Sequence, residues 1–121
     1  MNETIKTLKE LNDSITANCR KVSMLKIEKE IQEDYINNLE ASVQKDVAFE
    51  QNENGKAMYS NESLRSAEMV CRLRINKEYI DVRKNLIKLS TDIAQLIDTI
   101  ESEKRLFRIL RDEIKLLTKE E

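Results

Sequence analysis

Apolar residues recur at alternating steps of three and four along the last third of the chain, and this pattern constrains the fold more than any other. With Tyr79 at heptad position a, the a and d positions are Tyr79, Val82, Leu86, Leu89, Ile93, Leu96, Ile100, Glu103, Phe107, Leu110, Ile114 and Leu117. All of them except Glu103 are apolar. A repeat of about 3.5 residues keeps one stripe of an α-helix turned toward a partner helix. The sequence therefore predicts a long coiled-coil helix over residues 77–120.

The composition agrees with long helices. The chain has one glycine and no proline, so the usual residues of tight turns are scarce. Aromatic residues make up 4% of the chain, which is little for a compact globule. Apolar residues make up 40%, too many for a disordered polyelectrolyte. We expect one all-α domain over residues 1–121, a long antiparallel helical hairpin or coiled coil that assembles into a multi-helix bundle.

A second apolar line runs beside this seam. It consists of Ile80, Ile87 and Ala94 at b positions and Ile97 at an e position. An isolated pair of helices would leave these side chains in water, so a third or fourth helix should cover them. That helix comes either from the same chain or from another copy. We expect a homo-oligomer, with a dimer favoured, and the sequence does not identify any other protein partner.

Residues 3–51 are predicted to form the first helix. From Ile27 onward its apolar residues follow one another at steps of four: Ile27, Ile31, Tyr35, Leu39, Val43 and Val47. Repeated steps of four move an apolar line around the helix. We therefore expect a phase shift between Met24 and Ile27.

A chain reversal is predicted over residues 52–60, where Asn54-Gly55 can adopt positive φ at low cost. Gly55 is expected to cap the C-terminus of the first helix. Ser60 or Asn61 can cap the N-terminus of a second helix over residues 61–75. The phase changes again at Asn76, so a third helix either starts at residue 77 or continues the second one through a stutter. The similar lengths of 3–51 and 77–120 favour the break, and both models stay open.

The residue types argue against catalysis. The chain has no histidine, which removes the commonest general base and transition-metal ligand. Cys19 and Cys71 are far apart and belong to no ligand-spaced motif. No apolar stretch approaches the roughly 20 residues of a membrane span. We expect no catalytic residue, metal or cofactor, but a cytoplasmic, non-enzymatic scaffold or adaptor that self-associates and does not enter a membrane.

Glu103 stands out because it occupies a d position of the seam. One interpretation is a long carboxylate side chain that reaches water beside a lysine or arginine. The other is a buried polar residue that sets the register of the coiled coil.

Two basic clusters are candidate phosphate contacts. Arg65, Arg72 and Arg74 lie near the predicted reversal, and a ladder along the last helix comprises Lys104, Arg105, Arg108, Arg111 and Lys115. Acidic residues interleave with the ladder, and no aromatic platform for stacking bases accompanies either cluster. The net charge of −2 also gives no general attraction to nucleic acid. Solvated or intramolecular roles are favoured, and nucleic-acid binding through basic helix faces is the alternative function.

The segment Ser60-Asn61-Glu62-Ser63-Leu64-Arg65, followed by Arg72-Leu73 and Asn76-Lys77-Glu78-Tyr79, resembles small uncharacterised coiled-coil proteins of bacteriophages and prophages. In these an Asn-Glu-x-x-Arg box precedes a Leu, a polar break, a Tyr and a long helix. The resemblance covers roughly residues 60–110. It implies a mobile-element protein, an accessory to DNA recombination or replication, and it favours the break at Asn76. This break lacks the acidic-Pro pair of that pattern.

Overall fold

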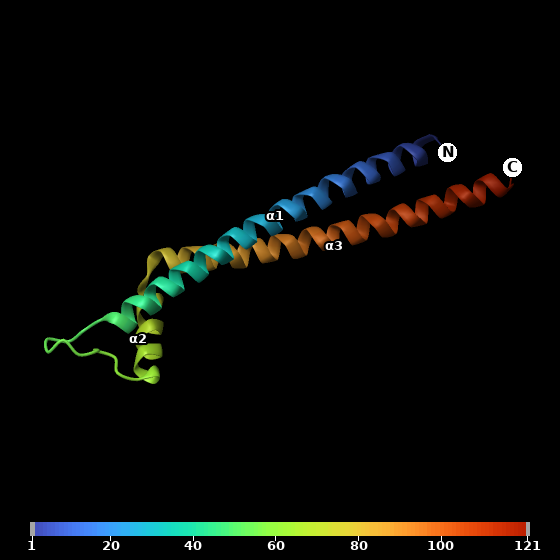
Figure 1. Ribbon diagram of the computed structural model, residues 1–121. Helices are drawn as coiled ribbons and strands as arrows, with labels where there is room; N and C mark the ends of the chain where they lie inside the picture. Colours follow the sequence, from blue (N-terminus) through green and yellow to red (C-terminus); the bar gives the residue numbers. More distant parts are fainter. Residues whose placement is uncertain (1, 121) are drawn as a thin grey trace. The chain divides into compact units, whose positions relative to one another are not determined.

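The computed structural model describes residues 2–120, and over that range it contains three α-helices (Figure 1). These are α1 (Asn2–Phe49), α2 (Glu62–Ile75) and α3 (Lys77–Glu120). The only β pairing within residues 2–120 is an isolated bridge between Gln51 and Ala57. The predicted all-α fold, a helical hairpin with a short additional helix, is confirmed.

The chain divides into two compact units, which we describe separately. Unit 1 joins Met1–Ile27 to Leu89–Glu121, and unit 2 is Glu28–Lys88. Unit 1 therefore contains the first part of α1 and most of α3, which run antiparallel. Unit 2 contains the rest of α1, the loop, all of α2 and the start of α3.

The core of unit 1 lies between its two helical segments. Val22 of α1 and Ile93 and Ile100 of α3 are buried together, and Ile15, Leu25 and Leu96 pack against them. All six residues occupy a or d positions of their helices, when the heptad of α1 is counted from Ile15 as position a. Burial of these apolar side chains is the main stabilising contribution between the two helical segments.

Unit 2 has its own buried residues, Ile36 and Val47 from α1 and Leu73 from α2. Val47 is the most enclosed side chain among the described residues. It also lines a small hollow against α2, together with Arg65 and Met69. The end of α1 is thus covered by α2, which explains why the short helix is held in this unit.

The predicted phase shift in α1 is wrong. Between Leu8 and Val43, most of its less exposed residues keep heptad spacing: Leu8, Leu11, Ile15, Asn18, Val22, Leu25, Lys29, Gln32, Ile36, Leu39 and Val43. Only the last step, from Val43 to the buried Val47 beneath α2, departs from this spacing and is a predicted step of four. In contrast, Ile27, Ile31 and Tyr35 are exposed. Packing against α3 selects the stripe that continues the heptad, and Lys29 and Gln32 can join it because their long side chains extend to water.

The loop after α1 begins earlier than the sequence predicted. Helix α1 stops at Phe49 rather than near residue 51, so Gly55 does not cap it. Gly55 has a φ of 76° and lies instead inside a reversal built around Asn52. The Asn52 side-chain oxygen accepts hydrogen bonds from the backbone N–H groups of Asn54 (2.9 Å) and Lys56 (3.1 Å). This local bonding replaces the helix cap that the glycine suggested.

Asn61 and Asn76 mark the ends of α2. Asn61 is the N-cap, and its side chain accepts a 2.8 Å hydrogen bond from the backbone N–H of Leu64. Helix α2 breaks at Asn76, whose backbone N–H donates to the carbonyl of Leu73. The Asn76 side chain accepts a 3.0 Å hydrogen bond from the backbone N–H of Tyr79. One residue therefore ends α2 and caps α3, which settles the alternative that the sequence left open.

Candidate interaction surfaces

The predicted seam of α3 is the face that packs on α1 in each unit. Leu89, Ile93 and Ile100 are buried. The other seam residues before Leu117, apart from Glu103, are half-buried: Tyr79, Val82, Leu86, Leu96, Phe107, Leu110 and Ile114. Leu117, the last seam position, is exposed. The intramolecular helix pair thus uses the seam for its own packing.

Glu103 meets a polar residue rather than a lysine or arginine. The side-chain amide of Asn18 donates a 2.7 Å hydrogen bond to Glu103 Oε1, and both residues are half-buried. Asn18 and Glu103 both occupy d positions of unit 1. The pair crosses the seam within one chain, so it links α1 and α3 at one relative position.

The second apolar line is largely uncovered. The Ile87 side chain is 66% exposed and Ile97 is 36% exposed. Ala94 is exposed as well, and Ile80 is half-buried. Ile87, Ala94 and Ile97 are thus exposed within the described residues, so this part of the line is accessible to another surface.

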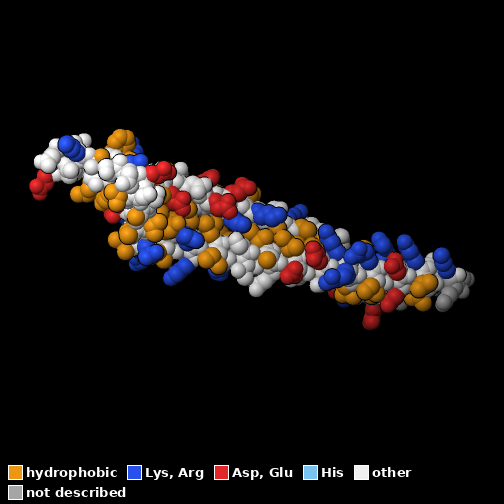
Figure 2. Space-filling view, turned by 90° about the horizontal axis from the view of Figure 1, so that it is seen from below, with side chains coloured by type: hydrophobic (Ala, Val, Ile, Leu, Met, Phe, Trp, Pro, Cys, Tyr) orange, Lys and Arg blue, Asp and Glu red, His pale blue; other side chains and the backbone are white. Residues whose placement is uncertain are grey.

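In unit 1, basic residues gather on one side of the helix pair, the side formed by the b and e positions of both helices. A shallow groove of about 360 Å³ runs between Asn12 of α1 and Lys104 and Arg108 of α3, with Ile15 and Phe107 at its floor. Arg111 and Lys115 continue the same line of α3, and Lys9 takes the corresponding place on α1. We call Lys9, Lys104, Arg108, Arg111 and Lys115 the basic side of unit 1. A row of basic side chains is visible along the upper edge of the right-hand part in Figure 2.

In unit 2, the b and e positions carry the opposite charge on α1. Glu30, Glu33 and Glu40 occupy these positions, and α3 contributes Ile80, Ile87 and Arg83. The Tyr79 hydroxyl donates to Glu40 Oε1 at 3.2 Å and accepts from Arg83 at 3.2 Å, which places the e positions of both helices on one side. We call Glu30, Glu33 and Glu40 the acidic side of unit 2.

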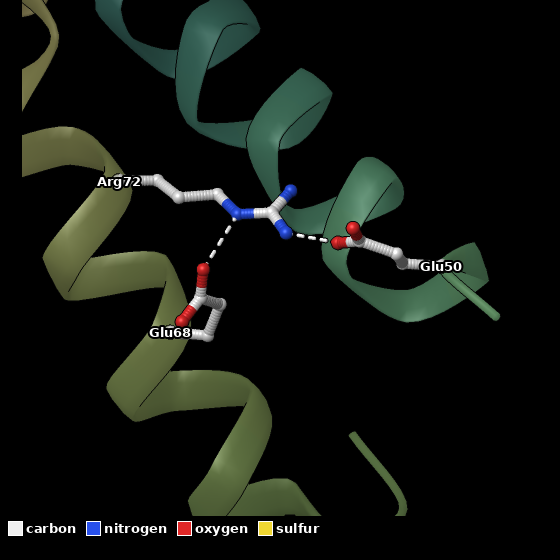
Figure 3. Close-up of polar contacts among 3 residues, drawn as sticks. All are labelled: Glu50, Glu68 and Arg72. Atoms are coloured by element: carbon white, nitrogen blue, oxygen red, sulfur yellow. Dashed lines mark hydrogen bonds and ion pairs between the residues drawn. The ribbon is translucent and has the colours of Figure 1, made fainter. Parts of the chain in front are cut away.

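Arg72 is held by contacts within unit 2 (Figure 3). Its guanidinium bonds Glu68 of the same helix at 2.9 Å and also pairs with Glu50. It lies 5.9 Å from the centre of the Tyr59 ring. Hydrogen bonds to Glu68 and Glu50 raise the pKa of Arg72 above its ordinary value. Arg72 therefore fastens α2 to the first residue of the loop, and its charge is already compensated.

The other sequence-predicted basic residues differ in their surroundings. Arg65 donates to the Tyr59 carbonyl at 3.3 Å, so it also holds the loop, whereas Arg74 is exposed. In the ladder, Arg105 bonds Ser102 at 3.3 Å and Arg111 lies 3.7 Å from Asp112. Lys104, Arg108 and Lys115 form no ion pair within residues 2–120. The two basic clusters therefore differ in their pairing, and only the ladder contains uncompensated charges in a row.

Sequence reasoning missed Asn18 and the acidic side of unit 2. Asn18 could have been found from the sequence, because it occupies a d position in the heptad of α1. That heptad runs through Leu8, Leu11, Ile15, Asn18 and Val22. The acidic side was hidden because the apolar residues after Ile27 suggested a different buried stripe. Once Ile36 and Leu39 are known to be packed, the side chains of Glu30 and Glu33 must lie at the edge of the helix pair.

The described residues contain no group of histidine, cysteine or carboxylate side chains arranged to hold a metal ion. Among the helices between residues 2 and 120, none has both the length and the apolarity needed to cross a membrane. Comparison of the chain with protein-family models, curated proteins and solved structures gives no match.

Proposed function

We propose that this protein is a non-catalytic interaction module that self-associates, with the second apolar line of α3 as the contact surface. The exposure of Ile87, at 66%, carries the proposal. An isoleucine on a regular helix, in line with three other apolar residues, favours burial by another helix. A second copy offers the same line, and a dimer would bury both copies of it.

The energy available supports a measurable association. Complete burial of an isoleucine side chain contributes about 1.5–3 kcal/mol, and each 1.4 kcal/mol changes a dissociation constant about tenfold. Ile87 and Ile97 from two copies therefore provide enough apolar surface to offset part of the entropy cost of association. The predicted assembly is a dimer with four helices in contact.

Sedimentation of the full chain over a range of concentrations tests this function. We expect a dimer that dissociates on dilution, and Ile87→Lys should shift the equilibrium toward monomer by at least about tenfold. Ile109→Lys is the matched control, because Ile109 is 56% exposed on α3 but occupies a c position outside the line. A wild-type chain that is monomeric at micromolar concentration would refute self-association.

Nucleic-acid binding is a second candidate, favoured by the uncompensated charges of Lys104, Arg108 and Lys115. It agrees with the accessory role in DNA recombination or replication that the phage resemblance implies. Affinity from phosphate contacts should fall steeply with salt. Gel retardation of single- and double-stranded DNA at low and moderate salt tests it, and no retardation of either at low salt would remove it.

A further inference from the structure

The basic side of unit 1 and the acidic side of unit 2 have complementary charge. Glu101 is the one acidic residue on the b and e positions near Lys104 and Arg108 in α3. On the acidic side of unit 2, Arg83 is the facing cation, and Lys29 lies 3.8 Å from Glu33. The charges of neither side are fully compensated by their own unit.

We propose that the basic side of unit 1 in one copy docks on the acidic side of unit 2 in a second copy. This inference rests on the proposed self-association and adds the identity of the facing residues. Each copy carries both sides, so the same contact can form in each direction between two copies. Opposite charge favours this pairing of unlike units over a pairing of like units, in which like sides would face each other.

The spacing of the charges fits this docking. Lys104 and Arg111 are seven residues apart on α3, and Glu33 and Glu40 are seven residues apart on α1. At a rise of 1.5 Å per residue, each pair spans about 10.5 Å along its helix. Two helices packed side by side can therefore match both charges without a change of register.

Apolar surface accompanies the charges on both sides. In unit 1, Ile15 and Phe107 form the floor of the groove beside Lys104 and Arg108. In unit 2, the exposed Ile87 side chain lies on the same side as Glu30 and Glu33. Docking would cover apolar area in each unit while the charged residues remain at the rim, where ion pairs steer association and fix the partner's orientation.

Charge exchange between two variants tests the docking. Lys104→Glu with Arg108→Glu makes the first variant, and Glu30→Lys with Glu33→Lys makes the second. Each variant alone should associate about tenfold to a hundredfold more weakly than wild type, because like charges then face each other. An equimolar mixture should form heterodimers with an affinity near that of wild type, since both reciprocal contacts are again complementary.

A matched control reverses two other exposed cations of unit 1, Lys6→Glu with Arg20→Glu, which lie at f positions. This variant should dimerise like wild type and should not pair preferentially with the Glu30→Lys, Glu33→Lys variant. Sedimentation and native mass spectrometry of the mixtures measure both homodimers and heterodimers.

The outcomes separate this inference from the proposed function. If wild type dimerises, Ile87→Lys weakens the dimer and neither charge variant has an effect, self-association stands and this docking is refuted. A monomeric wild type refutes both. If Lys104→Glu with Arg108→Glu abolishes DNA retardation and leaves the dimer unchanged, the basic side serves nucleic acid and the docking is also refuted.

Discussion

Asn18 of α1 donates a 2.7 Å hydrogen bond through its side-chain amide to the Glu103 carboxylate of α3. The two residues lie at d positions, where neighbouring residues such as Val22 and Ile100 are buried. A hydrogen bond to a charged group at a half-buried site contributes more than an exposed pair. Sliding one helix by a heptad would leave both polar groups against apolar side chains, so the pair disfavours other registers of unit 1.

Asn18→Ala should lower the free energy of unfolding by about 1–2 kcal/mol, because it leaves the Glu103 carboxylate half-buried without its donor. Urea denaturation followed by circular dichroism measures the change. Asn38→Ala is the matched control, since Asn38 is exposed on α1 and makes no side-chain hydrogen bond among the described residues. Equal effects of the two substitutions would contradict a role for the pair in stability.

Replacing both partners separates stability from register. Asn18→Leu with Glu103→Leu should be as stable as wild type or more stable, because an apolar pair suits a d position. The register should become less unique, which broadens the distribution of distances between spin labels on exposed positions of α1 and α3 in unit 1. A distribution as narrow as that of wild type would show that other contacts set the register.

Asn76→Ala should destabilise the protein by about 1 kcal/mol, because the first turn of α3 loses the side-chain acceptor for the backbone N–H of Tyr79. Asn76→Asp retains an oxygen acceptor at the cap and should be close to wild type. Thermal or urea unfolding of the three proteins gives the comparison. If Asn76→Ala equals Asn76→Asp in stability, the cap does not hold the break.

The register of α1 predicts opposite results for two isoleucines of unit 2. Ile36 is 8% exposed, and Ile36→Ala should cost about 2–4 kcal/mol. Ile31 is 60% exposed, and Ile31→Ala should change stability by less than about 0.5 kcal/mol. Urea denaturation of both variants decides between the observed heptad stripe and the line of four-residue steps, for which Ile31 would be the more costly site.

Arg72→Ala should loosen the loop after α1, since its guanidinium joins Glu68 of α2 to Glu50 at the start of that loop. Cleavage by trypsin after Lys56 should become a few times faster, while the helical content stays the same. Arg74→Ala removes a neighbouring exposed cation of α2 and should leave the cleavage rate unchanged. Identical rates for the two variants would mean that the ion pairs do not restrain the loop.

The heptad pattern from Tyr79 to Leu117 determined the identity and length of the last helix, because a period near that of the α-helix admits one secondary structure. The same pattern predicted which face of α3 would be least exposed. Local chemistry also indicated where α2 ends. It offered Ser60 or Asn61 as the N-cap and Asn76 as the break, because a capping side chain bonds backbone groups within a few residues.

Tertiary packing decided which stripe of α1 is buried. Leu39 belongs to both the predicted line and the heptad stripe, but Ile36 is buried whereas Ile31 is exposed. Local sequence favoured the more apolar line, because Lys29 and Gln32 interrupt the heptad stripe. The actual choice depends on the helix that packs against α1. The same choice fixed Asn18 as the partner of Glu103 and placed Glu30 and Glu33 at the edge of the helix pair. Seam and caps thus follow from periodicity and local bonding, whereas the pairing across the seam follows from contacts between distant residues.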